Sequence, residues 1–313
     1  MSAPHRHPPA EPQPVSILDT AAFWLKASRP GLWFPTLWLY LMPLSGMDVF
    51  HSPAFWAGVA FVTFPLNLLI YGWNDLVDVE TDALNPRKDS FLFGARPTAT
   101  QRQQLPWGIA IVLLISAPPI VAFGGVGRMI LVLLGIIAVT ALYNLPKWGL
   151  RGKPPLELFC QFGYLLVVPI SVWLNDAVMP GTITFIYLSL FCIQSQLIGE
   201  VMDIVPDRKA GRKTTATALG MRNTKILIIA IVAVEVALLF GFFGDPLFAG
   251  VLGLFLIWLI LDIAVIFRTQ QYTLNQMRLL GVGSNLVAIA TMGYVYGSGC
   301  LMSLDGPWAK LLV

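Results

Sequence analysis

The stretch PAFWAGVAFVTFPLNLLIYGWNDLVDVETD, residues 53–82, decides the fold, because a long apolar run ends in it with three closely spaced aspartates. These aspartates follow one another at intervals of three and four residues, which places them along one face of a helix. Carboxylates gathered in this way repel one another unless a cation lies between them. A second apolar run ends with the same spacing, so the sequence indicates a divalent-metal site built from two clusters: Asp75, Asp78 and Asp82, and Glu200, Asp203 and Asp207.

The composition indicates an integral membrane protein. Of the 313 residues, 56% are hydrophobic and 12% are charged, whereas soluble domains carry about 25% charged residues. The three cysteines lack the spacing of a zinc site, and no nucleic-acid partner is expected. The chain is therefore expected to have the lipid bilayer as its surroundings.

Apolar runs divide the chain into membrane spans. The predicted fold is an all-α, polytopic membrane helical bundle of about nine transmembrane helices, in two parallel four-helix repeats plus one. A disordered tail is predicted for residues 1–17, a membrane domain for 18–299 and a short C-terminal tail for 300–313. A short interfacial helix is expected at 17–28. The predicted spans are 32–49, 53–73, 106–123, 127–145, 156–174, 180–199, 224–243, 246–267 and 279–299.

The basic residues predict how the bundle is oriented. All Lys and Arg residues except Arg128 and Lys310 fall on the side of the N-terminus or in the loops on that side. By the positive-inside rule, the N-terminus and these loops are expected to be cytoplasmic and the C-terminus outside. In a bacterium the membrane would be the inner membrane. Both acidic clusters then lie at the cytoplasmic surface.

The neighbours of the acidic clusters narrow the chemistry. Ligands that offer only oxygen, with no His or Cys, favour Mg²⁺, which binds one or two carboxylates and takes its other ligands from water and phosphate. Basic residues beside the clusters suit a phosphate-bearing ligand. We therefore expect a site for Mg²⁺ and a diphosphate. The basic residues beside the clusters are Arg87, Lys88, Arg208 and Lys213.

Other polar residues lie inside the apolar runs. Asn67 precedes Asn74 on the same helical face, so it either lines the cavity or hydrogen-bonds a neighbouring helix. Glu235 has no obvious basic partner, and Asp262 is expected to pair with Arg268. Pro206 lies inside the second acidic cluster, so a bend is expected there rather than in the first.

Three motifs resemble those of the UbiA superfamily of intramembrane prenyltransferases. Asn74 to Asp82 is similar to its NDxxDxxxD motif, Asp203-x-x-x-Asp207 to its DxxxD motif, and Tyr143-x-x-x-Lys147 to its YxxxK motif. The resemblance implies that the aspartates hold Mg²⁺ on the diphosphate of an isoprenoid donor. It implies metal ligands Asp75, Asp78, Asp82, Asp203 and Asp207, of which Asp75, Asp78 and Asp203 are also catalytic with Tyr143 and Lys147. Asn74 is expected to touch the donor. The expected diphosphate contacts, in order of rank, are Lys147, Arg87, Lys88, Lys153, Arg208 and Lys213.

The resemblance predicts Mg²⁺-dependent transfer of a prenyl group from an allylic polyprenyl diphosphate to a hydrophobic acceptor, with release of diphosphate. The acceptor could be an aromatic or quinone precursor or another compound of isoprenoid metabolism. A carotenoid-elongating or terpene-cyclising activity within the same superfamily is the first alternative, and Asn85 to Lys88 resembles carotenoid-elongating members. A Mg²⁺-dependent transporter is the alternative from another class.

Overall fold

The computed structural model describes residues 16–312 and is all-helical over that range, apart from loops and turns. Of the tail predicted for residues 1–17, residues 1–15 lie outside the described residues, while Ser16 caps the first helix and Ile17 begins it. Short 3₁₀ and π-helical segments interrupt or extend several of the α-helices. In chain order the α-helices are α1 (Ile17–Ser28), α2 (Phe34–Leu41), α3 (Pro53–Asn67), α4 (Trp73–Val77), α5 (Val79–Ala83), α6 (Ala99–Gly124), α7 (Val126–Asn144), α8 (Leu156–Phe159), α9 (Val167–Leu174), α10 (Thr182–Lys209), α11 (Thr215–Leu238), α12 (Pro246–Leu261) and α13 (Leu274–Ser298).

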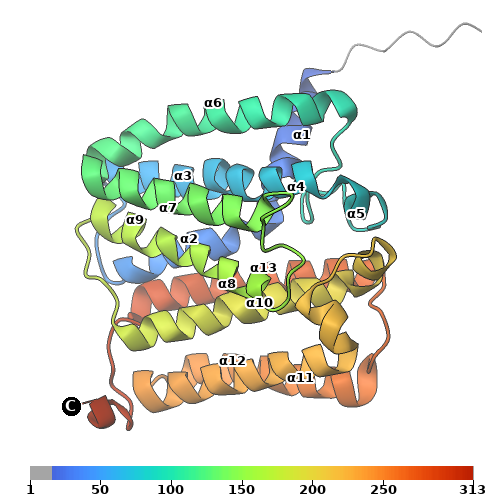
Figure 1. The fold of residues 1–313 in the computed structure, drawn as a ribbon. Coiled ribbons are helices and arrows are strands. Elements are labelled where there is room, and N and C mark those ends of the chain that lie inside the picture. Colours follow the sequence, from blue (N-terminus) through green and yellow to red (C-terminus); the bar gives the residue numbers. More distant parts are fainter. Residues whose placement is uncertain (1–15, 313) are drawn as a thin grey trace, which may run out of the picture.

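Eight helical segments of the described chain are long and apolar enough to cross a membrane. They are the continuous runs 53–77, 99–124, 126–144, 156–174, 182–209, 215–243, 246–266 and 274–298. A shorter apolar segment, Phe34–Leu44, precedes them. The order of the segments agrees with the prediction, and the longer helices lie roughly side by side in one bundle (Figure 1).

The first predicted span is shorter than expected. Helix α2 passes into a 3₁₀ turn at Met42–Leu44, and the chain is extended at Ser45. Pro43 has no N–H to continue the α-helical ladder, and Gly46 adopts a positive φ of 72°. The short helix is held in the core by Tyr40, whose hydroxyl donates to the Phe55 carbonyl at 3.0 Å. Gly58 permits this contact, because a Cβ there would lie 2.0 Å from the Tyr40 hydroxyl.

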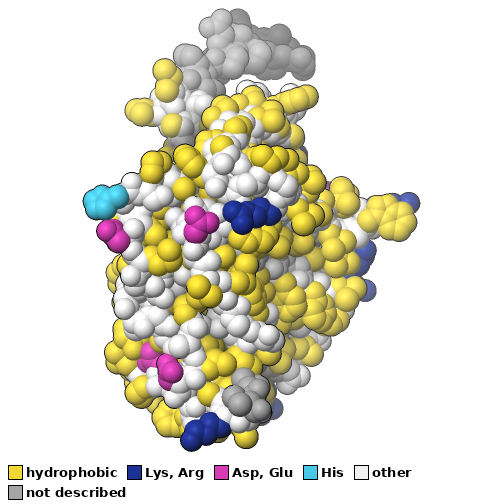
Figure 2. Space-filling view, turned by 90° about the vertical axis from the view of Figure 1, so that its left-hand side faces the viewer, with side chains coloured by type: hydrophobic (Ala, Val, Ile, Leu, Met, Phe, Trp, Pro, Cys, Tyr) yellow, Lys and Arg dark blue, Asp and Glu magenta, His cyan; other side chains and the backbone are white. Residues whose placement is uncertain are grey.

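The two ends of the bundle differ in character. At one end, α4, α5 and the loop at 84–98 lie near the C-terminal end of α10 and the start of α11 (Figure 1). The C-terminus lies at the other end, where charged side chains are sparse among hydrophobic and uncharged ones (Figure 2). Both acidic clusters therefore occupy the same end of the bundle, opposite the C-terminus.

Candidate functional site

The first acidic cluster follows a local change in helix geometry. A π-helical turn at Leu68–Gly72 joins α3 to α4, and such turns are frequent at functional sites. Helix α4 ends at Val77, and Asp78 has φ −93° and ψ 15° before α5 begins. The hydrogen bonds nevertheless continue across this break, since the N–H of Asp82 donates to the Asp78 carbonyl at 2.8 Å. The cluster thus keeps roughly helical spacing.

The second acidic cluster lies on an unbroken helix, although the sequence predicts a bend at Pro206 and a more regular first cluster. Helix α10 runs from Thr182 to Lys209 and includes this proline. A proline leaves the carbonyl four residues earlier, here that of Met202, without its helical donor. The side chain of Gln271 takes that place and donates to the Met202 carbonyl at 2.7 Å. The interruption lies instead in the first cluster, at Asp78.

The two clusters meet across one cavity of about 290 Å³. Asn85, which follows the first cluster, donates its amide to Asp203 at 2.8 Å. Arg212 lies between the clusters, 3.2 Å from Asp78 and 3.9 Å from Asp207. The carboxylates that line the cavity are Asp78, Asp82, Glu200, Asp203 and Asp207.

Asp75 does not line this cavity. Its side chain is fully buried and forms ion pairs at 2.6 Å with Arg29 and with Lys88. Its second oxygen accepts the backbone N–H of Ala95 at 3.0 Å. Lys88 also lies 2.7 Å from Asp82, which does line the cavity. Asp75 therefore supports the cavity wall by fixing its cations and the loop at 84–98.

Three arginines lie at the site although the sequence did not predict them as diphosphate contacts. Arg29 and Arg212 line the cavity, and Arg151 lies 2.5 Å from Asp78. Burial lowers the pKa of the Arg151 guanidinium below its ordinary value. Burial also opposes the charge of Arg212, but Asp78, Tyr143 and Asp207 outweigh it and raise its pKa. The site therefore holds fixed positive charge beside its carboxylates.

The carboxylates are crowded enough to disfavour full ionisation. Burial raises the pKa of Asp82 to about 6; Lys88 opposes this shift, while Asp78 and Asp75 add to it. An added cation would relieve this repulsion. Within residues 16–312, no three His, Cys, Asp or Glu side chains gather closely enough to hold a metal ion alone. An ion here would take one or two of these carboxylates and complete its shell with water and phosphate, which fits Mg²⁺.

The other predicted diphosphate contacts divide into two groups. Arg87 and Lys88 line the cavity, and Arg87 forms an ion pair with Asp203. The remaining four are exposed and lie outside the cavity lining: Lys147, Lys153, Arg208 and Lys213. Two of them contact Trp148 instead: the Lys147 ammonium lies 5.4 Å from the centre of its ring, and Lys153 donates to its carbonyl at 3.3 Å. The structure does not bring these four into the site.

Asn67 is a packing residue in this structure. It is fully buried, and its amide donates to the Thr36 hydroxyl at 2.9 Å and to two carbonyls of its own helix. It lines neither of the two cavities of the site. Of the two possibilities that the sequence left open, the structure therefore has the helix-packing hydrogen bond.

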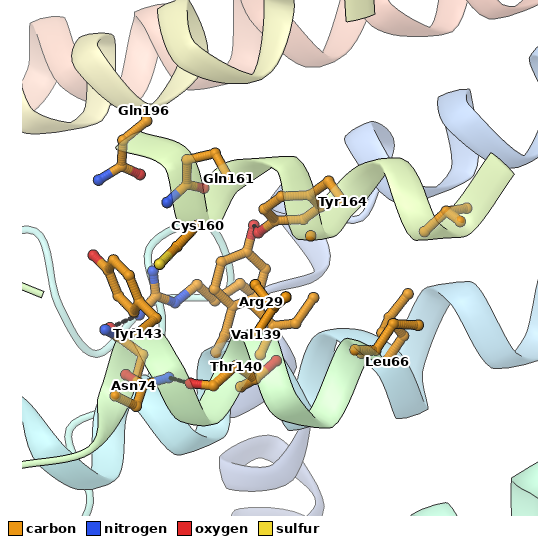
Figure 3. Close-up of a pocket in the computed structure, with 16 residues that line it drawn as sticks. Arg29, Leu66, Asn74, Val139, Thr140, Tyr143, Cys160, Gln161, Tyr164 and Gln196 are labelled. Atoms are coloured by element: carbon orange, nitrogen blue, oxygen red, sulfur yellow. Dashed lines mark hydrogen bonds between the residues drawn. The ribbon is translucent and has the colours of Figure 1, made fainter. Parts of the chain in front are cut away.

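A second cavity, of about 130 Å³, shares the polar end of the first. Asn74 and Tyr143 line both cavities, and Asn74 accepts a hydrogen bond from Arg29 at 3.2 Å (Figure 3). The Tyr164 hydroxyl donates to that of Tyr71 at 2.9 Å, and both tyrosines line both cavities. Gln161 and Gln196 also line both and had no recognisable signal in the sequence.

Two buried glutamates hold the start of α11 beside the site. Glu200 accepts the N–H of Ala216 at 3.0 Å and the Gln196 amide at 3.1 Å. Glu157 accepts both the N–H and the hydroxyl of Thr215 at 2.6 Å. The first N–H groups of a helix lack partners within the helix. The two carboxylates act as partners for these N–H groups. They therefore hold in place the start of α11 and the segment before it, which carries Arg212.

The predicted partner of Asp262 is wrong. Asp262 forms its ion pair with Lys225 of the neighbouring helix, at 2.6 Å, and accepts the Tyr272 hydroxyl at 2.8 Å. Arg268 takes part through its backbone, because its carbonyl accepts a hydrogen bond from the Lys225 ammonium at 2.9 Å. Both carboxylate oxygens of Glu235 are buried without a hydrogen-bond partner among the described residues.

The fold and the site define a multi-pass membrane protein with a cavity lined by carboxylates and basic side chains at one end of its helical bundle. A sequence model of the UbiA prenyltransferase family matches residues 32–298. The chain belongs to this family, and it is a prenyltransferase that uses a prenyl diphosphate as donor. This finding replaces the transporter hypothesis.

Two relatives are similar to this chain in sequence, and one solved structure is similar to it in fold. It is 27% identical over 214 residues to the lycopene elongase/hydratase of Corynebacterium glutamicum, covering 66% of this chain and 72% of the relative. It is 31% identical over 235 residues to the C(50) beta-cyclic carotenoids biosynthesis protein LbtBC of Dietzia sp., covering 68% of this chain and 49% of that protein. The fold is similar to that of a UbiA homolog from Archaeoglobus fulgidus bound to DMAPP and Mg²⁺. Its TM-score is 0.64 at 17% identity, over 88% of this chain and 99% of that one.

Proposed function

We propose that this enzyme uses Mg²⁺ to transfer a short prenyl group from an allylic diphosphate to the end of a carotenoid chain. The observation that carries the proposal is the meeting of both acidic clusters with Arg87, Lys88 and Arg212 in one cavity. That cavity continues into an apolar part lined by residues such as Leu32, Phe34 and Leu39. The polar end of the cavity thus suits the diphosphate of the donor, and the adjoining apolar part suits an apolar acceptor.

The metal would be held through four of the predicted ligands, Asp78, Asp82, Asp203 and Asp207, with Asp75 fixing the cations behind them. Mg²⁺ bound there would offset the charge that develops on the leaving diphosphate. Arg29, Arg87, Lys88 and Arg212 act on the same charge through hydrogen bonds. The resting ion pairs keep these groups in place before the donor binds.

The transfer begins when the bond between the allylic carbon and the diphosphate oxygen breaks, with its electron pair left on the oxygen. An alkene carbon of the acceptor then bonds to the allylic cation, and the product cation loses a proton. Water must be kept from the allylic cation. Aliphatic residues and the Tyr71–Tyr164 pair enclose the space next to Asn74 and serve this purpose.

The apolar lining favours a carotenoid over an aromatic acid as acceptor. An acid would need a cation in its own subsite, because a buried carboxylate without a partner is costly. The cations that line the cavity lie at its polar end, where they pair with the aspartates. The similar lycopene elongase/hydratases and the likeness of Asn85 to Lys88 to carotenoid-elongating members support the same choice.

The acceptor is tested by expressing the chain in a bacterial host that makes lycopene. Mass spectrometry of the extracted pigments should show carotenoids heavier by one or two five-carbon units, which Asp203→Ala abolishes. A pigment profile identical to that of the empty vector, together with prenylation of an added quinone precursor, would contradict the carotenoid proposal.

A further inference from the structure

Helix α10 carries a proline between the two aspartates of its acidic cluster. Because Pro206 has no N–H, the carbonyl of Met202 lacks its donor within the helix. Met202 is a buried residue, and a buried acceptor without a partner is costly. The acidic cluster therefore depends on a donor from outside α10.

That donor comes from the connection between α12 and α13. The side-chain amide of Gln271 donates to the Met202 carbonyl at 2.7 Å, from 69 residues further along the chain. Met202 directly precedes Asp203, whose carboxylate accepts the Asn85 amide and pairs with Arg87. Asp203 is thus held on its side chain by these two residues and, through its neighbour in the helix, on its backbone by Gln271.

A buried ion pair fixes the connection that carries Gln271. Lys225 of α11 pairs with Asp262 at 2.6 Å, and the hydroxyl of Tyr272 donates to Asp262 at 2.8 Å. The Lys225 ammonium lies 4.6 Å from the centre of the Tyr272 ring and donates to the Arg268 carbonyl at 2.9 Å. All three side chains of this group are buried. The connection is therefore held on both sides of Gln271 in the sequence.

We propose that Gln271 is a positioning residue of the site. Through the Met202 carbonyl it fixes the segment of α10 that carries Asp203 and Asp207. This inference rests on the proposed function, in which these two aspartates help to hold Mg²⁺ on the donor diphosphate. Groups that orient the ligands of a metal change its affinity without touching it. Loss of the Gln271 donor should therefore weaken the binding of Mg²⁺.

The proline makes a specific rescue possible. Gln271→Met keeps an unbranched side chain of similar length but removes the donor. Pro206→Ala restores a backbone N–H that can donate to the same Met202 carbonyl in a continuous helix. The carbonyl has two lone pairs, so it can accept this N–H whether or not Gln271 is present. The double variant should therefore regain what Gln271→Met alone loses.

The experiment measures the Mg²⁺ concentration that gives half-maximal diphosphate release from DMAPP, in purified protein reconstituted in liposomes that contain lycopene. Gln271→Met should raise this concentration about three- to tenfold, as expected for one lost hydrogen bond. Adding Pro206→Ala to that variant should bring it back towards the wild-type value. Gln276→Met is the matched control, because Gln276 is equally half-buried but accepts the N–H of Thr273 at the start of α13. It should leave the concentration unchanged.

A measurement without turnover separates positioning from simple stabilisation. Mg²⁺ with inorganic pyrophosphate should raise the unfolding temperature of the wild type in detergent. Gln271→Met should show a smaller increase, taken from its own unfolding temperature without additions, and the double variant should recover it. If Gln271 only stabilises the fold, the variant melts earlier without additions but keeps the full increase and the wild-type Mg²⁺ requirement. That result would overturn the inference.

A double variant as impaired as Gln271→Met would also overturn it. If Pro206→Ala does not fold, Gln271→Glu takes its place in the test, because it keeps the shape of the side chain but sets an oxygen against the Met202 carbonyl. It should raise the Mg²⁺ requirement at least as far as Gln271→Met, and a wild-type requirement would count against the inference. The absence of Mg²⁺-dependent diphosphate release from the wild type would instead overturn the proposed function, and the inference with it.

Discussion

At the scale of single residues, burial separates two aspartates that the sequence makes look equivalent. The side chain of Asp75 is 0% exposed and holds Arg29 and Lys88, whereas that of Asp203 is 21% exposed and lines the cavity. Removing one partner of a buried ion pair leaves the other charge uncompensated, at a cost of about 3–5 kcal/mol. Replacing Asp75 should therefore lower the stability of the protein, whereas replacing Asp203 should lower its activity.

We expect Asp75→Ala to lower the thermal unfolding temperature in detergent strongly, even without substrate. Asp203→Ala should leave the unfolding temperature close to that of the wild type but abolish diphosphate release. Differential scanning fluorimetry and the release assay on the same preparations measure both properties. Equal unfolding temperatures for the two variants would show that Asp75 does not carry the structural task that its contacts indicate.

Arg212 and Lys213 form a matched pair, adjacent in the chain but on different sides of the cavity wall. Arg212 contacts Asp78 and lines the cavity, whereas Lys213 is exposed. A hydrogen bond to a charged group contributes about 1.5–3 kcal/mol. Arg212→Gln should thus lower kcat/KM for the donor by roughly 10- to 100-fold, while Lys213→Gln changes it little. Steady-state kinetics with DMAPP measure both effects. A larger effect at Lys213 would favour the prediction from sequence, in which Lys213 rather than Arg212 contacts the diphosphate.

Residue spacing predicted which carboxylates belong together, but not which cations meet them. Asp203 and Asp207 are recognisable because they lie on one helix at the end of an apolar run. Arg29 and Arg151 come from distant segments, and their contacts depend on how α1 and the loop after α7 fold back. Lys147 shows the converse, since it lies in a matching motif and yet is exposed.

At the scale of elements, tertiary contacts decide where helices begin and end. Apolar run length predicted the centres of the spans, but α6, α10 and α11 extend beyond them into polar sequence. Side chains distant in the chain sustain these extensions, as Gln271 does at Met202 and Glu157 does at Thr215. Such contacts leave no periodic pattern in the sequence, which is why the sequence did not predict that α10 continues unbroken through Pro206.

The start of α11 gives a test at this scale. Glu157→Ala would leave the buried N–H of Thr215 without an acceptor, which costs about 1–3 kcal/mol. We expect a lower unfolding temperature and a higher KM for the donor, because Arg212 precedes this helix. Glu157→Gln keeps an acceptor and should cost less. If the two variants melt at the same temperature as the wild type, Glu157 does not anchor α11.

At the scale of the whole molecule, the proposed orientation places the site at the cytoplasmic surface. Residues 18–299 form the proposed catalytic unit, which encloses the region matched by the family model. Lys209, at the end of α10, and Asp176, in the loop before α10, are both exposed. The three native cysteines are buried, so thiol labels should report introduced cysteines.

In intact bacterial cells, an impermeant maleimide should label Asp176→Cys and spare Lys209→Cys until the membrane is opened. This result follows from the concentration of basic residues on one side of the bundle. The reverse pattern of labelling would place the site outside the cell and contradict the proposed orientation.

The most direct test of the account is diphosphate release by the purified protein in lycopene-containing liposomes with DMAPP. Two acidic clusters that face one cavity predict release that requires Mg²⁺, stops with EDTA, and is lost in Asp78→Ala and in Asp203→Ala while both variants remain folded. Release that continues at the wild-type rate in EDTA, or in either folded variant, would contradict the account.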